Sequence, residues 1–394
     1  MKILIVSNAP WSKTGYGVQT NLFSTRLQKA GHEVAVLCYY GLEGGAFSYN
    51  GILCFPRALH PYGMDVMNAH AKSFGAHMIM TLMDAWVVDT RGMEPFDWIA
   101  YYPVDHEPMP QKVRQNVAFA NFRIAMSKFG VEQSHKAGLD CYYVPHGVDT
   151  ELYKPMDKIE AREKLNLPKD AWIVGTVAMN KGMPPRKNFP NMLKAFASFK
   201  RKHTDALYYL HTQEGVGRDG LGGVNIPELC EILGLRYGKD VVVTSPYNMY
   251  FGLNDEMMAS LYSAFDVHLL ASTGEGFGVP IIEAQSCGVP VIVGGWTAMP
   301  ELVHSGHIID KSEALQTYTG IASYQFEASA ESIERKLQLE FKKPSPRDKA
   351  RKGMVENYDI NVVFDRHMLP TFQDIEKRKL AENDRYEKVA EARK

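Results

Sequence analysis

Residues 272–295 read STGEGFGVPIIEAQSCGVPVIVGG, and this stretch decides the fold of the chain. An apolar run, Val267–Ser272, leads into it, and a second apolar run, Val289–Val293, lies near its end. Between the two runs, a glycine-rich loop is followed by Pro280 and later by Gly288. Helices favour proline just inside their start and glycine just past their end. The stretch therefore predicts a strand, a glycine loop, a short helix and a second strand.

Two glutamates lie in this unit, Glu275 in the loop and Glu283 in the first turns of the expected helix. The backbone N–H groups of the loop and the positive end of the helix attract an anion. A carboxylate can accept hydrogen bonds from two adjacent hydroxyls, so Glu283 suits a ribose and Glu275 suits a sugar ring. A nucleotide sugar has both kinds of group. The alternative is an ordinary loop glutamate and a helix glutamate favoured by the helix dipole.

Length and composition indicate a soluble globular protein of two domains, because the chain has 394 residues, of which 45% are hydrophobic and 23% charged. The formal net charge of −1 gives no bulk attraction to a polyanion. The five cysteines are scattered without metal-ligand spacing, so neither a disulfide framework nor a metal site is expected. No apolar window reaches the ~18 residues of a membrane span. A cytoplasmic protein fits these features best.

The first half of the sequence alternates short apolar runs with helical patterns. The runs are rich in Val, Ile and Tyr and alternate little in polarity, which is typical of parallel strands buried on both faces. This pattern predicts a doubly wound α/β domain. The strands expected here are Lys2–Ser7, Glu33–Tyr40, Gly51–Pro56, His77–Leu82, Trp98–Val104, Arg123–Ser127 and Cys141–Pro145.

A second strand–helix series follows a charged, proline-containing connection over residues 149–170. After Glu331 the pattern is mostly helical, and the last residues are dense in alternating charge. We therefore expect Rossmann-like domains over residues 1–160 and 161–360, followed by a terminal helix over residues 361–394. Besides the two runs around the opening stretch, the strands expected in the second domain are Trp172–Met179, Ala206–Thr212 and Asp240–Ser245.

Three motifs together carry a family resemblance. EGFGVPIIEAQSCGVPVI (residues 275–292) resembles the Glu-x7-Glu signature of retaining glycosyltransferases, particularly those of glycosyltransferase family 4. VPHGVD (144–149) is similar to the VPNGVD of that family, and PRKNFPNML (185–193) is similar to its basic phosphate-binding segment. The resemblance implies the GT-B fold, in which two Rossmann-like domains face a central cleft. It places the acceptor mainly on the N-terminal domain and the donor mainly on the C-terminal one, with the terminal helix crossing back to the N-terminal domain.

The activity implied by the resemblance is retaining transfer of a hexosyl group from a UDP- or GDP-sugar to a hydroxyl acceptor. Basic residues on the diphosphate make a metal dispensable, and no cofactor is required. Arg186 and Lys187 are the expected cations, because fixed positive charge stabilises a departing diphosphate. The family usually has an arginine just after the first strand of this domain, where this chain has Met179 or Asn180. Lys181 and Arg186 are both candidates to replace it, and Arg186 is favoured.

The resemblance also assigns further residues. Gly15 and Gly17 open a helix after the first strand, and the resemblance brings their loop to the donor phosphates. His106 follows the strand ending at Val104, where the family often has a histidine near the transferred sugar. Its neighbour Asp105 is a weaker candidate. Catalytic roles are thus expected for His106, Glu275, Arg186 and Lys187. His211 and Ser245 end two strands, so by the rule that strand ends face the binding crevice they are also expected around the nucleotide. The remaining residues expected there belong to the opening stretch and are Gly276, Phe277, Gly278, Val279 and Glu283.

Several alternatives remain open from the residues. A phosphorylase or epimerase of the same fold would cleave or rearrange the same donor. A nicotinamide oxidoreductase is disfavoured, because the GxGxxG pattern that begins at Gly215 does not open a helix. A third possibility is a non-catalytic nucleotide-sugar-binding protein. The acceptor is unknown and could be a glycan, a small molecule or a modified nucleic acid base.

Overall fold

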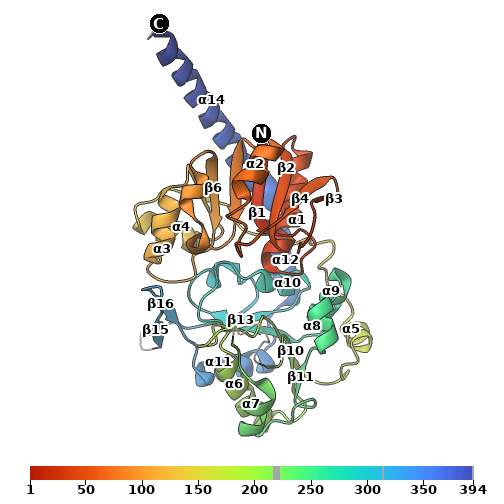
Figure 1. The fold of residues 1–394 in the computed structure, drawn as a ribbon. Coiled ribbons are helices and arrows are strands. Elements are labelled where there is room, and N and C mark those ends of the chain that lie inside the picture. Colours follow the sequence, from red (N-terminus) through yellow and green to blue (C-terminus); the bar gives the residue numbers. More distant parts are fainter. Residues whose placement is uncertain (216–221, 313–314, 393–394) are drawn as a thin grey trace. The chain divides into compact units, whose positions relative to one another are not determined.

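The computed structural model describes residues 1–215, 222–312 and 315–392, the side chains of Tyr250 and of residues 383–392 excepted. The chain forms two compact units, and it passes from one unit into the other at four points along the sequence (Figure 1). Unit 1 consists of Met1–Val104, Met109–Gly147 and Ile360–Lys394. Unit 2 consists of Asp105–Pro108 and Val148–Asp359.

Unit 1 is built on a sheet whose described strands have the order β3-β4-β2-β1-β5-β6-β7-β8. Neighbouring strands are parallel, except that β3 runs antiparallel to β4. The carboxyl ends of the parallel strands therefore lie along one edge of the sheet. The strands are β1 (Lys2–Asn8), β2 (Glu33–Tyr40), β3 (Phe47–Tyr49), β4 (Ile52–Pro56), β5 (Met78–Leu82), β6 (Asp97–Tyr102), β7 (Phe122–Ala125) and β8 (Tyr142–Tyr143).

The central strands of unit 1 are apolar on both faces because both faces are covered. In β1, Ile3, Leu4 and Ile5 are all 0% exposed, although successive side chains point to opposite sides. The core also contains the indole of Trp98, whose N–H donates to Oγ1 of Thr81 at 3.0 Å. The continuous apolar runs in the sequence thus correctly predicted a doubly wound parallel sheet.

The helices of unit 1 come from both ends of the chain. The last segment joins this unit through its own contacts: the Lys379 ammonium pairs with the Asp97 carboxylate at 2.9 Å, and the Tyr142 hydroxyl donates to Asp374 at 2.5 Å. The helical elements are α1 (Gly15–Lys29), α2 (Met67–Phe74), α3 (Gln111–Ala118), α4 (Lys128–Lys136), α13 (Ile360–Val363), α14 (Leu369–Ala392) and the short turns η1 (Ala85–Val87), η2 (Thr90–Met93) and η4 (Phe364–Met368).

Unit 2 contains a parallel sheet whose described strands have the order β11-β10-β9-β12-β13-β14, together with a separate antiparallel hairpin, β15-β16. The sequence patterns did not indicate β14 or the hairpin. The strands are β9 (Ile173–Val177), β10 (Leu207–His211), β11 (Val241–Val243), β12 (Val267–Leu270), β13 (Val291–Gly294), β14 (Gly306–Ile309), β15 (Gln316–Tyr318) and β16 (Tyr324–Phe326).

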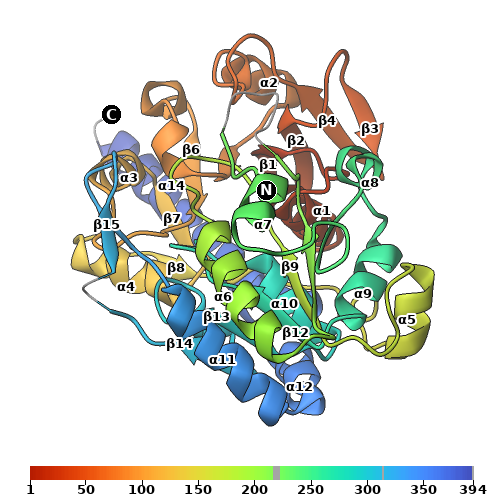
Figure 2. The same ribbon diagram turned by 90° about the horizontal axis from the view of Figure 1, so that it is seen from below.

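Helices α6 and α11 lie side by side against the sheet of unit 2 (Figures 1 and 2). The rings of Phe199 and Phe341 meet edge to face with centroids 5.7 Å apart, and the Lys202 ammonium pairs with Glu334 at 2.8 Å. The helical elements of this unit are α5 (Lys158–Lys164), α6 (Phe189–Lys202), α7 (Ile226–Ile232), α8 (Pro246–Phe251), α9 (Asp255–Ser263), α10 (Val279–Ser286), α11 (Ala330–Lys342), α12 (Arg347–Asn357) and the turn η3 (Pro300–Leu302).

Each sheet has one point at which the strand order reverses. In unit 1 this switch point lies between β1 and β5, and in unit 2 it lies between β9 and β12. In open α/β sheets, ligands bind outside the carboxyl ends of the strands at such a point. The loops that follow these four strands are therefore where functional side chains are expected.

The limits of the units differ from the domain limits expected from the sequence. The first long boundary lies after Gly147 instead of residue 160, because the backbone N–H of Val148 donates to the Tyr358 carbonyl at 2.9 Å within unit 2. Asp105–Pro108 also belongs to unit 2, where the Glu107 N–H donates to the Tyr324 carbonyl at 3.1 Å. The expected terminal helix is grouped with unit 1 from Ile360 onward.

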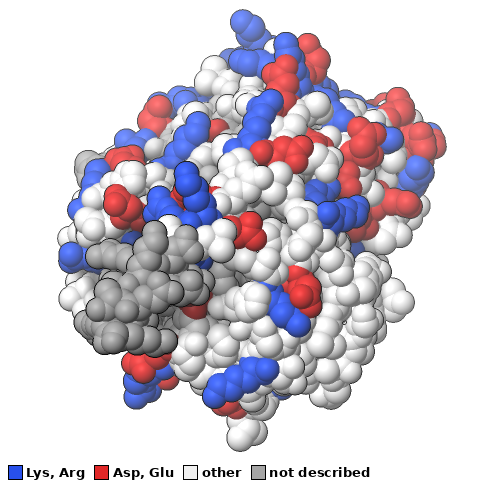
Figure 3. Space-filling view, turned by 90° about the horizontal axis from the view of Figure 1, so that it is seen from above, with Lys and Arg blue, Asp and Glu red and all other residues white. Residues whose placement is uncertain are grey.

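Charged side chains of both signs are interspersed on the face shown in Figure 3, with no broad field of one sign. This distribution agrees with the formal net charge of −1. Among the helices described, none is both long enough and apolar enough to cross a membrane.

A substitution at Gly175 tests how tightly the core of unit 2 is packed. Gly175 lies in β9, and a β-carbon there would overlap the buried ring of Phe265. We expect Gly175→Ala to lower the free energy of unfolding by about 1–3 kcal/mol, because overpacking displaces neighbouring groups. Urea denaturation of both proteins measures the difference. Gly45→Ala is the matched control, since no atom lies within 4 Å of an added β-carbon there. Equal losses for both variants would contradict this packing.

Candidate functional site

Residues 272–295 and the strand before them form the elements that were predicted for them. Strand β12 leads into the glycine loop, α10 follows, and β13 comes next. Gly278 precedes α10 with φ +110°, and Gly288 follows the helix with φ +74°, both in the region that favours glycine. The loop therefore needs glycine at Gly278 to turn from the strand into the helix.

Glu275 lies in this loop at the switch point and is 7% exposed. Its backbone N–H donates to Oγ1 of Thr297 at 3.1 Å, which fixes the loop. Its carboxylate pairs with the ammonium of Lys187 through Oε1, and Oε2 lies 3.4 Å from Nη1 of Arg186. Two cations thus surround one nearly buried carboxylate.

Arg186 and Lys187 come from the loop on the other side of the same switch point, between β9 and α6. The backbone N–H of Thr273 donates to the Arg186 carbonyl at 2.8 Å, so the two loops are joined through their main chains. The guanidinium of Arg186 also donates to the carbonyl of Gly274. The structure therefore brings Arg186, Lys187 and Glu275 together, as proposed from the sequence motifs.

Asp105 and His106 lie next to this cluster within unit 2. The Asp105 carboxylate is 2.7 Å from Nδ1 of His106 and 3.9 Å from Nη1 of Arg186. A β-carbon at Gly274 would overlap the Asp105 carbonyl, so the absence of a side chain lets this segment approach the glycine loop. Asp105 therefore links His106 to the Arg186–Glu275 pair.

The charges of the cluster stabilise one another. Burial alone would raise the pKa of Glu275, but the charges of Lys187 and Arg186 lower it below its usual value. Burial, together with the nearby Arg186, lowers the pKa of Lys187 to about 8. Burial opposes ionisation of Asp105 as well, yet its hydrogen bond to His106 lowers its pKa. At neutral pH the site therefore contains two ionised carboxylates and two cations.

Glu283, the second glutamate of the motif, lies in α10 and accepts a hydrogen bond from the hydroxyl of Tyr262 at 2.7 Å. It is 7% exposed, and burial raises its pKa to about 7. No cation among the described residues pairs with it. Its environment thus differs from that of Glu275, although both come from one motif.

Asn180 stands where the resembled family usually has an arginine, and its side chain is fully used by the protein. Its Nδ2 donates to the carbonyls of Gln213 and Val224, at 3.1 and 2.7 Å, and its Oδ1 accepts from the Val224 N–H at 2.9 Å. Asn180 therefore binds the main chain at Gln213 and Val224, and its side-chain amide has no N–H left for a phosphate.

The remaining expected residues are dispersed. His211 ends β10, and burial lowers its pKa to about 4. Ser245 precedes α8, and its hydroxyl oxygen accepts a hydrogen bond from the Asn248 N–H at 3.2 Å. No hydrogen bond among the described residues joins either one to the Glu275 cluster. Phe277 is 3% exposed, and Val279 begins α10 beyond Gly276 and Gly278. The GxGxxG pattern falls mostly on residues 216–221, outside the described residues.

Gly15 and Gly17 belong to unit 1. Gly15 begins α1, and the Gly17 N–H donates to Oγ1 of Thr14 at 3.1 Å. A β-carbon at Gly17 would overlap the Ser12 carbonyl, so the helix start needs glycine to pack against the preceding loop. A helix opening at this glycine pair was predicted from the sequence, and it is confirmed.

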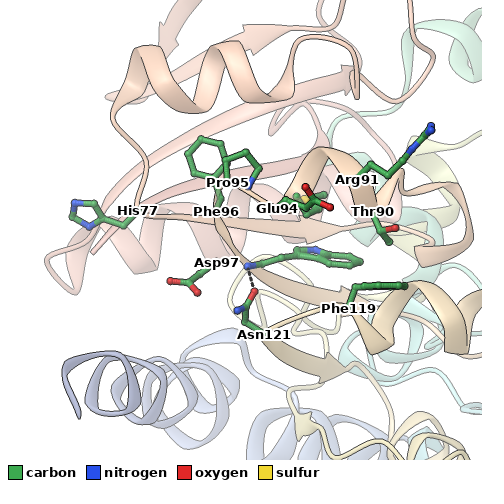
Figure 4. Close-up of a pocket in the computed structure, with 11 residues that line it drawn as sticks. His77, Thr90, Arg91, Glu94, Pro95, Phe96, Asp97, Phe119 and Asn121 are labelled. Carbon is green, nitrogen blue, oxygen red and sulfur yellow. Dashed lines mark hydrogen bonds between the residues drawn. The ribbon is translucent and has the colours of Figure 1, made fainter. Parts of the chain in front are cut away.

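A separate hollow of about 520 Å³ lies in unit 1, at the amino ends of β5 and β6 (Figure 4). Its walls include His77, Glu94 and Phe119, and none of the expected site residues lines it. It lies at the edge of the sheet opposite the switch-point loops. We found no group of three or more His, Cys, Asp or Glu residues that could bind a metal ion among the residues described.

Sequence comparison relates unit 2 to known enzymes. Residues 174–336 match the family described as Glycosyl transferases group 1. The chain resembles group 1 glycosyltransferases. It is 32% identical over 168 residues to the D-inositol 3-phosphate glycosyltransferase of Stackebrandtia nassauensis, covering 42% of this chain and 36% of the relative. It is 28% identical over 162 residues to the MMP alpha-(1->4)-mannosyltransferase of Mycolicibacterium hassiacum. This match covers 41% of this chain and 33% of the relative. The chain thus spans about a third of the length of these curated relatives.

Solved structures with the same fold cover nearly the whole chain. Sucrose-phosphate synthase from Thermosynechococcus elongatus aligns with a TM-score of 0.75 at 16% identity, over 97% of this chain and 100% of that one. Anabaena HepE in complex with UDP-glucose aligns with a TM-score of 0.67 at 16% identity, over 95% of this chain and 100% of that one. At such identity the likeness shows the fold alone. The GT-B fold class and the resemblance to glycosyltransferase family 4 are confirmed.

Sequence reasoning missed the partners that complete the site. Tyr262 and Thr297 contact Glu283 and Glu275 from other elements, and no local pattern singles them out. Asp105 was only a weaker candidate, although its position after a strand end was a usable signal. The motif residues could be found because glycine and proline constrain the backbone around them.

Glu283 gives a prediction about pH. Its pKa is about 7 in the folded protein against an ordinary value of 4.5, so the folded state keeps a proton that the unfolded state releases. Stability from this group is therefore present below pH 4.5 and is lost as the pH rises to about 7. We expect the free energy of unfolding of the wild type, relative to Glu283→Gln, to fall by up to about 3 kcal/mol over that range. Denaturant titrations at pH 4.5, 6 and 8 measure it. Parallel pH profiles for the two proteins would contradict the shift.

Proposed function

We propose that the protein is a retaining glycosyltransferase that moves a hexosyl group from a UDP- or GDP-sugar to a hydroxyl acceptor. The observation that carries this proposal is the cluster of Arg186, Lys187 and Glu275 at the switch point of unit 2. It lies within the region that matches group 1 glycosyltransferases. The UDP-glucose complex of Anabaena HepE, a protein of the same fold, supports a nucleotide sugar as donor.

Arg186 and Lys187 would stabilise the leaving group. When the sugar–phosphate bond breaks, negative charge accumulates on the nucleoside diphosphate, and fixed cations lower the energy of that state. The guanidinium can grip phosphate oxygens bidentately, and the ammonium acts as a point charge. These two charges would take the part that a divalent metal has in other enzymes, so the proposed reaction needs no obligatory metal.

Retention of configuration follows from attack on the front face. The bond between the anomeric carbon and the phosphate oxygen breaks, and the bond to the acceptor oxygen forms on the same side. The acceptor proton passes to an oxygen of the departing phosphate, so no enzyme nucleophile is required. Glu275 would position the donor sugar through its hydroxyls.

Glu283 and His106 would contact the ends of the donor. With a pKa of about 7, Glu283 would accept hydrogen bonds from a ribose diol as its carboxylate while the Tyr262 hydroxyl remains on Oε2. The ionised Asp105 can only accept a hydrogen bond, so Nδ1 of His106 carries the hydrogen and Nε2 is the nitrogen left for the sugar. The remaining residues would complete the nucleotide pocket. They are His211 and Ser245 at strand ends and the loop from Gly276 to Val279.

Gly15 and Gly17 of unit 1 would approach the phosphates of the donor.

A panel of UDP-, GDP- and ADP-sugars tests the function. We expect nucleotide release from one donor, with transfer to an acceptor detected by mass spectrometry and retention detected by NMR of the product. Glu275→Gln should reduce transfer by about 10²–10³-fold, because the sugar loses a positioning carboxylate, yet weaken nucleotide binding by no more than about threefold, because both cations remain and a carboxylate that competes with the diphosphate is removed. Loss of nucleotide binding with an intact fold would contradict the role given to Glu275.

The same experiment separates the remaining alternatives. A sugar phosphate formed with inorganic phosphate indicates a phosphorylase, and a rearranged donor indicates an epimerase. Nucleotide-sugar binding without release of nucleotide indicates a non-catalytic binding protein. No release from any donor of the panel would refute the proposed transfer.

Arg186 and Lys181 are the two candidates to replace the arginine that the family usually has at the position of Met179 or Asn180. Substituting each of them distinguishes the two. Only Arg186 contacts Glu275, whereas Lys181 is exposed. We expect Arg186→Ala to lower kcat/KM for the donor by about 10²-fold, because one charge that stabilises the diphosphate is lost. Lys181→Ala serves as the matched control and should stay within about twofold of the wild type. The reverse order of effects would assign the phosphate contact to Lys181.

A further inference from the structure

The hairpin of β15 and β16 (Figure 1) is bonded to both segments that carry the carboxylates of the site in unit 2. The main chain of Tyr324 exchanges two hydrogen bonds with that of Glu107, at 3.1 and 3.2 Å, and the Phe326 N–H donates to a main-chain carbonyl at 3.2 Å. That carbonyl belongs to Thr273 in the glycine loop, and Glu107 belongs to the short segment that also contains Asp105. Strand β16 is therefore fixed between these two segments.

Side chains strengthen this attachment of β16. The Lys311 ammonium pairs with the Glu107 carboxylate at 2.7 Å and lies 4.0 Å from the ring centroid of Phe326. The hydroxyl of Ser323, which is fully buried, donates to the Pro108 carbonyl. The residue between the two anchored positions of β16 is therefore held firmly beside the site.

Gln325 is that residue, and its side-chain amide faces the glycine loop. It is 9% exposed, and its Oε1 accepts a hydrogen bond from the Thr273 hydroxyl at 2.9 Å. This hydroxyl also lies 3.2 Å from the Arg186 carbonyl, but that carbonyl already accepts the Thr273 N–H. Nε2 of Gln325 lies 3.3 Å from the place of a β-carbon on Gly274, and the Asp105 carbonyl borders the same place. Nε2 therefore lies where the glycine loop meets the Asp105 segment.

The two N–H groups on Nε2 are not used by the protein. Among the residues that the structure describes, the Gln325 side chain makes its hydrogen bond with Thr273 through Oε1. Polar groups that are largely buried are nearly always hydrogen-bonded in proteins. An oxygen atom of a bound ligand would be the partner of these N–H groups.

The groups around Nε2 favour a sugar hydroxyl over a phosphate oxygen as that partner. Asp105 and Glu275 are ionised, so they can only accept hydrogen bonds. Phosphate oxygens also only accept, and the two carboxylates would repel them, so the place for a phosphate is at Arg186 and Lys187. A hydroxyl group both donates and accepts. It can donate to Glu275 and accept from Gln325 at the same time.

We propose that Gln325 determines which sugar the donor carries. Its Nε2 donates to one hydroxyl of the transferred sugar, and the same hydroxyl donates to Glu275. This inference rests on the proposed glycosyl transfer, and it adds a residue that lies outside the three sequence motifs. A site with one donor and one acceptor for the same hydroxyl disfavours a sugar in which that hydroxyl is missing or inverted, because both groups would then lack a partner.

A double-mutant cycle between Gln325 and the sugar tests the proposal. UDP-glucose, UDP-N-acetylglucosamine and GDP-mannose are screened first, and calorimetry then gives the Kd of the tightest one, of its monodeoxy sugar analogues and of free UDP or GDP. We expect Gln325→Met to weaken binding of the nucleotide sugar about tenfold and of UDP or GDP by less than about twofold. The two proteins should bind the analogue without the contacted hydroxyl equally, whereas the other analogues should keep the tenfold difference.

Three further variants serve as controls. Gln316→Met changes an exposed glutamine on the facing strand β15 and should bind every ligand as the wild type does. Thr273→Val removes the hydroxyl that orients the amide and should weaken binding of the nucleotide sugar severalfold, and Thr273→Ser should restore it. Thermal unfolding verifies the fold of each variant. If Gln325→Met does not fold, the cycle is measured with Thr273→Val.

Binding separates this inference from the proposed function, because it requires no turnover. A donor that is transferred, but whose analogues all keep the same difference between the two proteins, would overturn the role of Gln325 and leave the transfer standing. A wild-type Kd for Gln325→Met would do the same. One coupled hydroxyl in a nucleotide sugar that binds but is never transferred would support the contact and refute the transfer. Binding of no nucleotide sugar would refute both.

Discussion

The burial of the Glu275 carboxylate is the constraint on which the site of unit 2 depends. An ionised carboxylate that is 7% exposed is stable only if positive charge and hydrogen bonds compensate its lost hydration. Lys187 and Arg186 supply the charge, and both come from the loop after a different strand. The pairing therefore joins the loops after β9 and β12, and Asp105 extends it to His106. Removing any member leaves an uncompensated charge among the others.

The pairing of two cations with two carboxylates determines how strongly the cluster would attract an anionic ligand. Arg186 and Lys187 are already matched by Glu275 and Asp105, so the cluster has little net charge before a ligand arrives. A diphosphate bound as proposed would have to compete with two carboxylates for the same N–H groups. The glycine loop and the N-terminus of α10 then add the attraction that the side chains lack. Specificity would come from the exchange of partners, because net attraction is weak.

The sequence predicted the features that depend on local constraints. Glycine at Gly278, proline at Pro280 and the unbroken apolar runs fix α10, β12 and the parallel sheets through backbone geometry and burial. It did not predict Tyr262 or Thr297, because their contacts depend on how distant elements pack. Strands β14, β15 and β16 were missed because their residues are few, partly exposed and weakly patterned. The boundary after Gly147 depends on a main-chain hydrogen bond from Val148 to Tyr358 that no pattern near it encodes.

The two units share one topological feature but carry different side chains at it. Both sheets reverse their strand order once, so both present two loops from neighbouring strands at the carboxyl edge. In unit 2 those loops carry Arg186 and Glu275, whereas in unit 1 they lead into α1 at Gly15 and into the turn η1. Paired charge that is buried beneath a glycine loop loses hydration, which is costly to the fold. The cluster of Arg186, Lys187 and Glu275 lies at the point where open α/β sheets bind ligands, and this coincidence supports the donor site proposed for unit 2.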